Sequence, residues 1–269
     1  MMIKKLIWLF VFLILFSSVT IPEQSSIQKF ESHYNRVIKK CTDRYGKTDT
    51  PVWLSMWNLE TEKYPFNFSH SDSIPCRVYL DRSVDAPGGS TLYWDLPDVA
   101  AAVDIARQTG NKKLKMAAKS YVKSYLENNT ANNGIILWGN HYYYDVLIDT
   151  TVKFKSSEKP EPVNFQTETG NLHEMRPILP PWELLYQWHP ERIEKHIRET
   201  AKLHIADSET GEFNRHANQK SEYAFLESGS ILINSLAFLY SKTDDSKLLD
   251  LAESILEYSF SNRNPETGL

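Results

Sequence analysis

The chain has 269 residues, a length that suits one large domain or two small ones. Hydrophobic residues make up 41% of it and charged residues 24%, which excludes a disordered or fibrous chain. Lys and Arg number 30 against 34 Asp and Glu, a formal net charge of −4. Proteins that bind nucleic acid carry a basic surface, so no nucleic-acid partner is expected. The 7 Trp, 14 Tyr and 12 Phe suit either stacking on sugar rings or an aromatic helical core.

Residues 1–20 have the pattern of a secretory signal peptide. Two lysines precede an apolar run from Leu6 to Phe16, and small polar residues follow it. The run is shorter than the ~20 apolar residues of a membrane-spanning helix. We therefore expect a secreted or periplasmic protein with no stable membrane anchor after signal removal, with an uncleaved anchor as the alternative. In an oxidising compartment Cys41 and Cys76 could form a disulfide.

Most of the chain after residue 27 has helical apolar periodicity. Residues 95–109 begin with a capping Asp95 and an early Pro, and a second periodic run over 112–128 follows a Gly-Asn break. A hairpin of the same design recurs at 236–256. A third helix pair is expected over 181–206, with Pro at the start of both helices.

Repeated helical hairpins predict an all-α fold, an (α/α) toroid or a solenoid of hairpins. We expect one such domain over residues 21–269. A Glu-Thr-Gly loop at 207–213 recurs at 264–269, where the chain stops in place of a further helix. The toroid is therefore expected to be incomplete, with its C-terminal part missing.

Three polar clusters interrupt the helical pattern, at 138–145, 171–177 and 213–218. Each contains a histidine outside any helical run. The three histidines are His141, His173 and His216. Polar groups concentrated within a helical scaffold indicate a site. Imidazole together with carboxylate suits a divalent transition metal such as Mn, Zn or Ni, and the guanidinium groups of Arg176 and Arg215 suit recognition of a carboxylate.

The segment from Trp138 to Glu227 resembles the bacterial pectate lyases of polysaccharide lyase family two. The resemblance rests on His-Glu-Met at 173–175, Pro-Trp-Glu-Leu-Leu-Tyr at 181–186, a helix that starts His-Pro-Glu, and Phe-Asn-Arg-His at 213–216. More loosely, the hairpins resemble the α/α-toroid carbohydrate enzymes, such as the six-hairpin glycosidases. The resemblance implies a toroid that cleaves homogalacturonan, a uronate polysaccharide, by β-elimination with the help of a transition metal.

The resemblance also implies roles for individual residues. His216 would be a metal ligand and Arg215 the catalytic base, and Glu174 would be the carboxylate ligand. His141 would be the remaining histidine ligand, with His173 as its competitor.

The chemistry of β-elimination is consistent with these residue types. Removal of the C5 proton of a uronate builds negative charge on its carboxylate, which a metal and a cationic side chain would stabilise. A free guanidinium has a pKa above 12, so it is a poor base unless its surroundings deprotonate it. A tyrosine of the run 142–144 is an alternative acid or base, and we select Tyr143. The other substrate-binding candidates are polar or flat side chains. They are Asn140, Asn214, Arg176, Trp138 and Trp182. The two tryptophans could equally pack in a core.

Two other functions compete with the lyase. A glycoside hydrolase on the same scaffold would need two carboxylates that flank the scissile bond. Its candidates are Asp145, Asp149, Glu174, Glu183 and Glu227, and the sequence does not pair them. A non-catalytic helical-repeat protein that binds glycans is the third reading. No P-loop, GxGxxG, HExxH or GxSxG motif is present, which disfavours nucleotide-binding, zincin and serine-esterase classes.

Overall fold

The computed structural model describes residues 25–54, 89–139, 141–154 and 160–268. The expected signal peptide, Asn140 and Cys76 lie outside these ranges, and so does any pairing of Cys76 with Cys41. The helices are α2 (Ser26–Lys40), α4 (Leu92–Thr109), α5 (Lys112–Asn128), α6 (Trp182–Trp188), α7 (Pro190–His204), α8 (Leu226–Thr243) and α9 (Ser246–Ser261). The strands are β1 (Gly89–Ser90), β2 (Tyr142–Asp145), β3 (Thr150–Lys153), β4 (Glu161–Pro162), β5 (Ile205–Asp207) and β6 (Glu212–Phe213).

The prediction of an all-α toroid is wrong, because the fold is mixed α/β. Strands β1 to β4 form an antiparallel sheet in the order β1-β2-β3-β4, and β5 pairs with β6 in a separate antiparallel hairpin. The central pairing places Tyr142 opposite Lys153 and Tyr144 opposite Thr151. Aromatic and β-branched residues fill β2 and β3, and such residues pack well on a pleated surface.

The three predicted helix pairs are present as α4–α5, α6–α7 and α8–α9. The start of α4 differs from the prediction, because the helix begins at Leu92 and Asp95 lies inside its first turn. Asp95 is buried there and accepts a hydrogen bond of 2.7 Å from the Tyr121 hydroxyl. The Asp95 carboxylate thus binds a tyrosine on α5, whereas the sequence pattern predicts that it caps the start of the helix.

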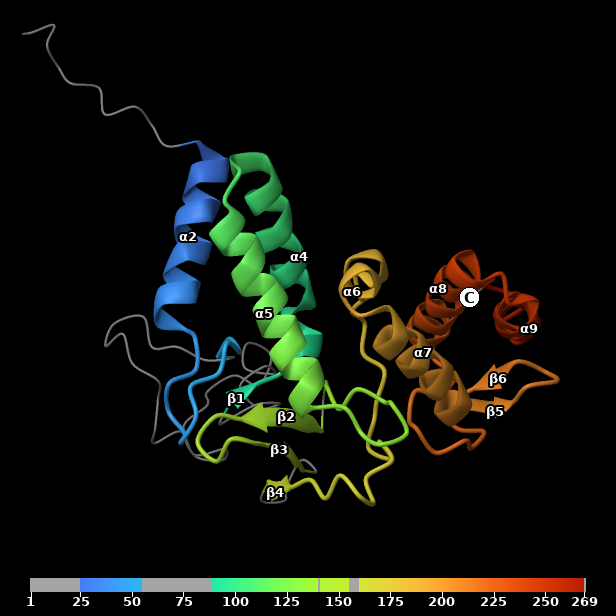
Figure 1. Ribbon diagram of the computed structural model, residues 1–269. Helices are drawn as coiled ribbons and strands as arrows, with labels where there is room; N and C mark the ends of the chain where they lie inside the picture. The colour runs from blue at the N-terminus through green and yellow to red at the C-terminus, as the bar shows by residue number, and fades with distance from the viewer. Residues whose placement is uncertain (1–24, 55–88, 140, 155–159, 269) are drawn as a thin grey trace, which may run out of the picture.

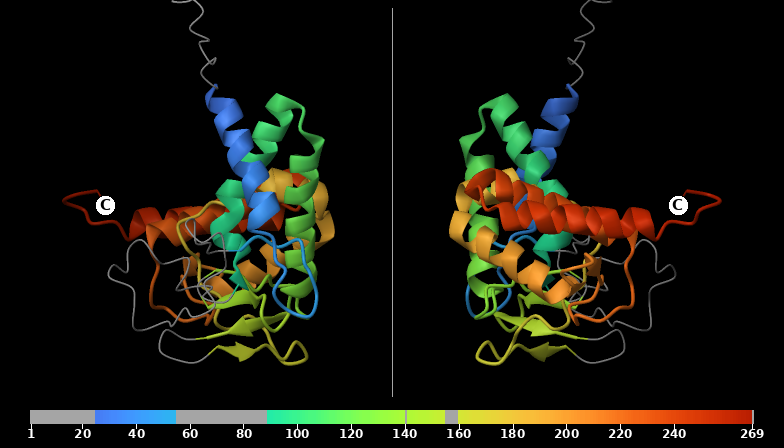
Figure 2. Two further views of the ribbon diagram at one scale, coloured as in Figure 1. Left: turned by 90° about the vertical axis from the view of Figure 1, so that its left-hand side faces the viewer. Right: turned by 90° about the vertical axis from the view of Figure 1, so that its right-hand side faces the viewer.

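Figure 1 shows α2, α4 and α5 side by side, with the β1–β4 sheet below the lower ends of α4 and α5. Helices α6 to α9 and the β5–β6 hairpin form the other half of the molecule, and the sheet stays at the same end in both views of Figure 2. One hydrophobic core runs through both halves, from Tyr34 on α2 to Ile255 on α9. The Thr151 hydroxyl on β3 donates to the Asn128 carbonyl at the end of α5, at 2.6 Å.

Two chain reversals bring the polar clusters together. Strand β2 begins directly after His141, so the sheet directs this side chain. Helix α7 ends at His204 and leads through the β5–β6 hairpin to Asn214.

Within the described residues, no helix has both the length and the apolar character that a bilayer crossing requires.

Candidate functional site

Glu174 is the centre of the polar cluster and is only 6% exposed. Its Oε1 pairs with Nη2 of Arg215 and lies 3.9 Å from Nη1 of Arg176. Nε2 of His216 lies 3.4 Å from Oε1, and Nε2 of His141 lies 3.5 Å from Oε2. Five of the residues proposed from sequence, drawn from three separate segments, therefore meet at one carboxylate.

The backbone joins two of these segments. Glu174 and His216 form an antiparallel bridge. The Met175 N–H donates to the Arg215 carbonyl and the Ala217 N–H donates to the His173 carbonyl, each at 3.0 Å. Residues that face each other across an antiparallel pair have side chains on the same side. The bridge therefore sets the side chains of Glu174 and His216 next to each other.

His141 is oriented by the end of β3. Its Nδ1 lies 3.0 Å from the carbonyl of Phe154, whose own N–H donates to the His141 carbonyl at 3.1 Å. A carbonyl can only accept, so Nδ1 carries the proton and Nε2 is the atom that faces Glu174. A histidine that donates one ring N–H to a backbone carbonyl and presents the other nitrogen has the orientation of a metal-binding imidazole.

A chain of buried imidazoles runs behind the cluster. Trp138 Nε1–H donates to Nε2 of His173 at 3.2 Å, so His173 carries its proton on Nδ1 and donates to Nε2 of His204 at 2.8 Å. His204 in turn donates from Nδ1 to the Asn214 carbonyl at 2.9 Å. Burial lowers the pKa of His204 to about 4 and that of His173 well below its usual range, so both rings are neutral.

This imidazole chain bears on the choice between His141 and His173 as the partner of Glu174. Both ring nitrogens of His173 are engaged inside the core, whereas His141 is the histidine that faces the Glu174 carboxylate. Neighbours in an extended segment point to opposite sides, so the side chains of His173 and Glu174 face away from each other.

Asn214 has a structural position in this fold. It is fully buried, its Oδ1 accepts the His216 N–H at 3.0 Å, and its Nδ2 donates to Asn218 Oδ1 and to the Lys220 carbonyl. The side chain shapes the loop beneath His216 and does not face solvent.

Sequence reasoning missed Tyr93 on α4. Its hydroxyl accepts the Arg176 N–H at 3.2 Å and is within donating distance of the carbonyls of Arg176 and Ile178. Burial raises the pKa of Tyr93 to about 12, so the hydroxyl keeps its proton. Tyr93 thereby positions the backbone of Arg176. A single tyrosine within an amphipathic helix carries no local signal of such a contact.

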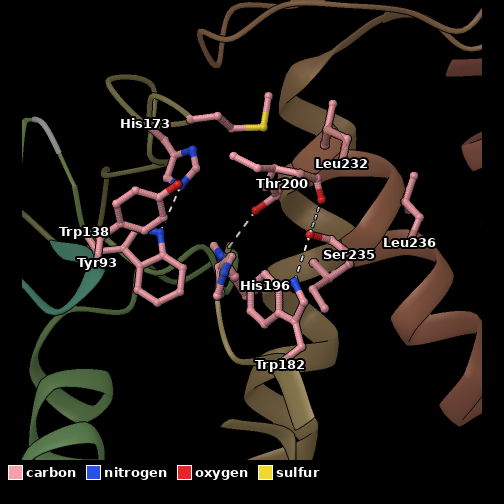
Figure 3. Close-up of a pocket in the computed structure, with 13 residues that line it drawn as sticks. Tyr93, Trp138, His173, Trp182, His196, Thr200, Leu232, Ser235 and Leu236 are labelled. Carbon is pink, nitrogen blue, oxygen red and sulfur yellow. Dashed lines mark hydrogen bonds between the residues drawn. The ribbon is translucent and has the colours of Figure 1, made fainter. Parts of the chain in front are cut away.

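The aromatic residues proposed to contact substrate are buried. Trp138 and Trp182 are 2% and 5% exposed and line a cavity of about 20 Å³ together with His173 and His196. Figure 3 shows their rings directed into the core between the helices. A cavity of this size has room for about one water molecule and none for a sugar. Tyr143 is 1% exposed, and its hydroxyl donates to Asp145 at 3.4 Å.

The charges around Glu174 favour an anionic ligand. Two guanidinium groups face the Glu174 carboxylate, and guanidinium groups are the side chains best suited to bind a carboxylate ligand. Nε of Arg215 is buried and has no hydrogen-bond partner within the described ranges. The donor types of His141, Glu174 and His216, two imidazoles and a carboxylate, match those of a divalent transition metal. As the side chains stand, no group of three or more His, Cys, Asp or Glu in the described part of the chain is arranged to hold an ion.

Comparison with known proteins agrees with the resemblance. A family model described as periplasmic pectate lyase matches residues 101–224, an interval that contains His141, Glu174, Arg215 and His216. A pectate disaccharide-lyase from Dickeya dadantii (strain 3937) is 24% identical over 260 residues, which cover 81% of this chain and 45% of that protein. The chain thus spans about half the length of the curated relative it matches. These comparisons support a pectate lyase-like family.

Proposed function

We propose that the chain is an exported polysaccharide lyase that cleaves uronate polymers such as pectate by β-elimination. The observation that carries the proposal is the convergence of two guanidinium groups and two imidazoles on the buried Glu174 carboxylate. The family match supports the reaction class, and the two guanidinium groups, which suit a carboxylate ligand, support an acidic substrate. The apolar run at Leu6–Phe16 and the family description support export.

The reaction requires a base for the C5 proton and positive charge beside the uronate carboxylate, and the cluster offers a group for each. Loss of the C5 proton leaves an electron pair that forms the C4=C5 double bond as the C4–O glycosidic bond breaks, and the departing oxygen takes a proton from water. Arg176, which is 27% exposed, would bind the uronate carboxylate on which negative charge develops. Arg215 would face C5 as the proton acceptor, for which its guanidine group must be neutral, and its contact with Glu174 holds the group in place.

A divalent cation would be held by His141, Glu174 and His216. The imidazole nitrogens lie 3.4 and 3.5 Å from different oxygens of the Glu174 carboxylate, so the three side chains would have to shift to share one ion. The Nδ1–H tautomer of His141 leaves its Nε2 lone pair for an ion. When bound, such an ion supplies positive charge that offsets the enolate-like charge and favours the neutral form of Arg215.

The test is cleavage of polygalacturonate by the full chain, followed by the ultraviolet absorbance of the 4,5-unsaturated product. We expect activity that is lost on chelation and restored by Mn²⁺, and a loss of about 100-fold or more in kcat/KM for His216→Ala and Arg215→Ala. His33→Ala, on exposed α2, is the matched control and should keep full activity. Saturated reducing ends without absorbance would instead identify a hydrolase, and binding without cleavage would identify a glycan-binding protein.

A further inference from the structure

Two exposed aromatic rings lie beside the charged cluster. Tyr223 is 49% exposed and Phe225 is 45% exposed, in the segment between His216 and α8. Their ring planes are nearly parallel, with an angle of 25° and a centroid separation of 6.0 Å. Large apolar side chains left in water next to a polar site are typical of ligand-binding surfaces.

The pair is fixed relative to the residues that we propose for catalysis. The Arg215 N–H donates to the Tyr223 carbonyl at 2.9 Å. The Arg215 guanidinium lies over the Phe225 ring at 5.3 Å, and the His216 ring meets Tyr223 edge to face at 5.3 Å. Each exposed ring thus contacts one member of the Arg215–His216 pair. A ligand held at that pair would therefore lie beside the aromatic rings.

The burial of the tryptophans strengthens this assignment. Trp138 and Trp182 belong to the core, so they offer no flat face to a sugar. Tyr223 and Phe225 each keep nearly half of their surface in solvent, next to the guanidinium groups that suit a uronate substrate. The axial C–H bonds of a pyranose ring form an apolar surface that packs against an aromatic ring, while its carboxylate remains free to meet a guanidinium.

We propose that Tyr223 and Phe225 form a stacking subsite for the sugar ring adjacent to the uronate whose carboxylate binds Arg176 and whose C5 faces Arg215. The ligand is therefore an oligomeric uronate of at least two rings. This inference rests on the proposed function for the identity of the sugar. Its physical content, that an oligosaccharide binds across the aromatic pair, can be measured without any turnover.

The test is calorimetric binding of tetragalacturonate to the full chain, both with and without Mn²⁺. We expect Tyr223→Ala combined with Phe225→Ala to raise Kd by about 10-fold or more, the loss typical of a removed aromatic contact. Tyr223→Phe keeps the ring and should bind as the unaltered chain does. Phe30→Ala, which removes a ring that is 56% exposed on α2, is the matched control and should not change Kd.

The kinetic constants distinguish a loss of substrate binding from a displacement of the Arg215 side chain. If the chain cleaves polygalacturonate, the double variant should raise KM and leave kcat within about twofold. A fall in kcat at constant KM would overturn the subsite, since it would mean that the rings only support Arg215. An unchanged Kd in the double variant, or no binding of tetragalacturonate to the unaltered chain, would overturn it as well. Binding that depends on Tyr223 without cleavage would leave the subsite intact and reject the lyase.

Discussion

At the scale of single residues, one carboxylate connects three distant parts of the chain. Glu174 receives Arg215 and Arg176 and stands beside His141 and His216, and it is nearly inaccessible to water. A buried carboxylate between guanidinium groups is costly to remove, because the cations would be left without their partner. Glu174 is therefore expected to serve the stability of the fold as well as its activity.

Glu174→Gln tests the structural part of this role. The amide keeps the shape but loses the charge, so we expect the free energy of unfolding to fall by about 3 kcal/mol. Glu183→Gln is the control, because Glu183 is 78% exposed and its pair with Lys242 contributes about 1 kcal/mol or less. Urea denaturation measures both. Equal midpoints for the two variants would contradict the structural role.

Replacement of the His204 imidazole is also expected to lower the free energy of unfolding. His204→Phe keeps a flat ring but leaves the His173 Nδ1–H and the Asn214 carbonyl without their present partner. Each unsatisfied buried group costs about 1–3 kcal/mol. We expect a loss of about 2–4 kcal/mol in urea denaturation, against a negligible change for His33→Phe at the exposed surface of α2. A His204→Phe variant as stable as the unaltered chain would show that the imidazole chain contributes nothing.

At the scale of elements, the β5–β6 hairpin carries Asn214 and the Arg215–His216 pair into the cluster. Phe213 at its end is 1% exposed and packs against α8, where Gly229 lets the ring approach the helix backbone. A Cβ at position 229 would lie 2.7 Å from Cζ of Phe213. The absence of a side chain at this one helical position therefore lets α8 hold the hairpin.

The contact between Gly229 and Phe213 determines whether Gly229→Ala raises or lowers the free energy of unfolding. In a helix interior, Ala is more stable than Gly by about 1 kcal/mol, so an unconstrained site would gain stability. Here overpacking against Phe213 should reverse the sign and cost about 1–3 kcal/mol. Thermal or urea unfolding measures the change, and Ser230→Ala, the exposed neighbour on α8, serves as the control. A stabilised Gly229→Ala would show that Phe213 moves aside without cost.

The helix pairs were predictable because their signals are local. Apolar residues three and four apart, together with capping and Pro positions, locate α4–α5 within a few residues, whereas α8 begins at Leu226, well before the predicted range 236–256. The strands were missed because each is only two to four residues long, too short for periodicity. The run Tyr142–Tyr144 and the Thr-Thr-Val at 150–152 did carry β propensity, and that signal could have located β2 and β3.

At the scale of the whole molecule, three buried histidines lie where the two halves of the fold meet. His173, His196 and His204 are each within 4% of full burial. Burial lowers the pKa of His196 to about 3, and its Nδ1 accepts the Ile136 N–H at 3.1 Å, which requires the neutral ring. The folded state therefore excludes protons that the unfolded chain would bind.

The pH dependence of stability follows from these three rings. Above pH 6.5 the histidines are neutral in both states and contribute no slope. As the pH falls from 6.5 towards 4, only the unfolded chain takes up the protons, so the free energy of unfolding falls by about 1.4 kcal/mol per pH unit for each histidine. Urea denaturation between pH 7.5 and 5 measures the slope.

His196→Asn is the matched variant for this measurement. The Asn Oδ1 can accept the Ile136 N–H in place of the imidazole Nδ1, and it does not titrate. Between pH 6.5 and 5, we expect the free energy of unfolding of the variant to change less steeply with pH, by the amount that corresponds to about one proton. This expectation holds whatever the absolute stability of the variant. A slope that does not change would mean that His196 contributes nothing to the pH dependence.

The amino-acid sequence by itself determined the helix pairs, the three polar clusters and the chemical types within them, because each depends on residues close together in the chain. It could also propose that His141, Glu174, Arg215 and His216 meet. Only the tertiary structure decided that Trp138 and Trp182 lie in the core, that His173 turns away from Glu174, and that Tyr223 and Phe225 remain in water. Burial and side-chain direction depend on contacts between residues far apart in sequence, which local patterns do not encode.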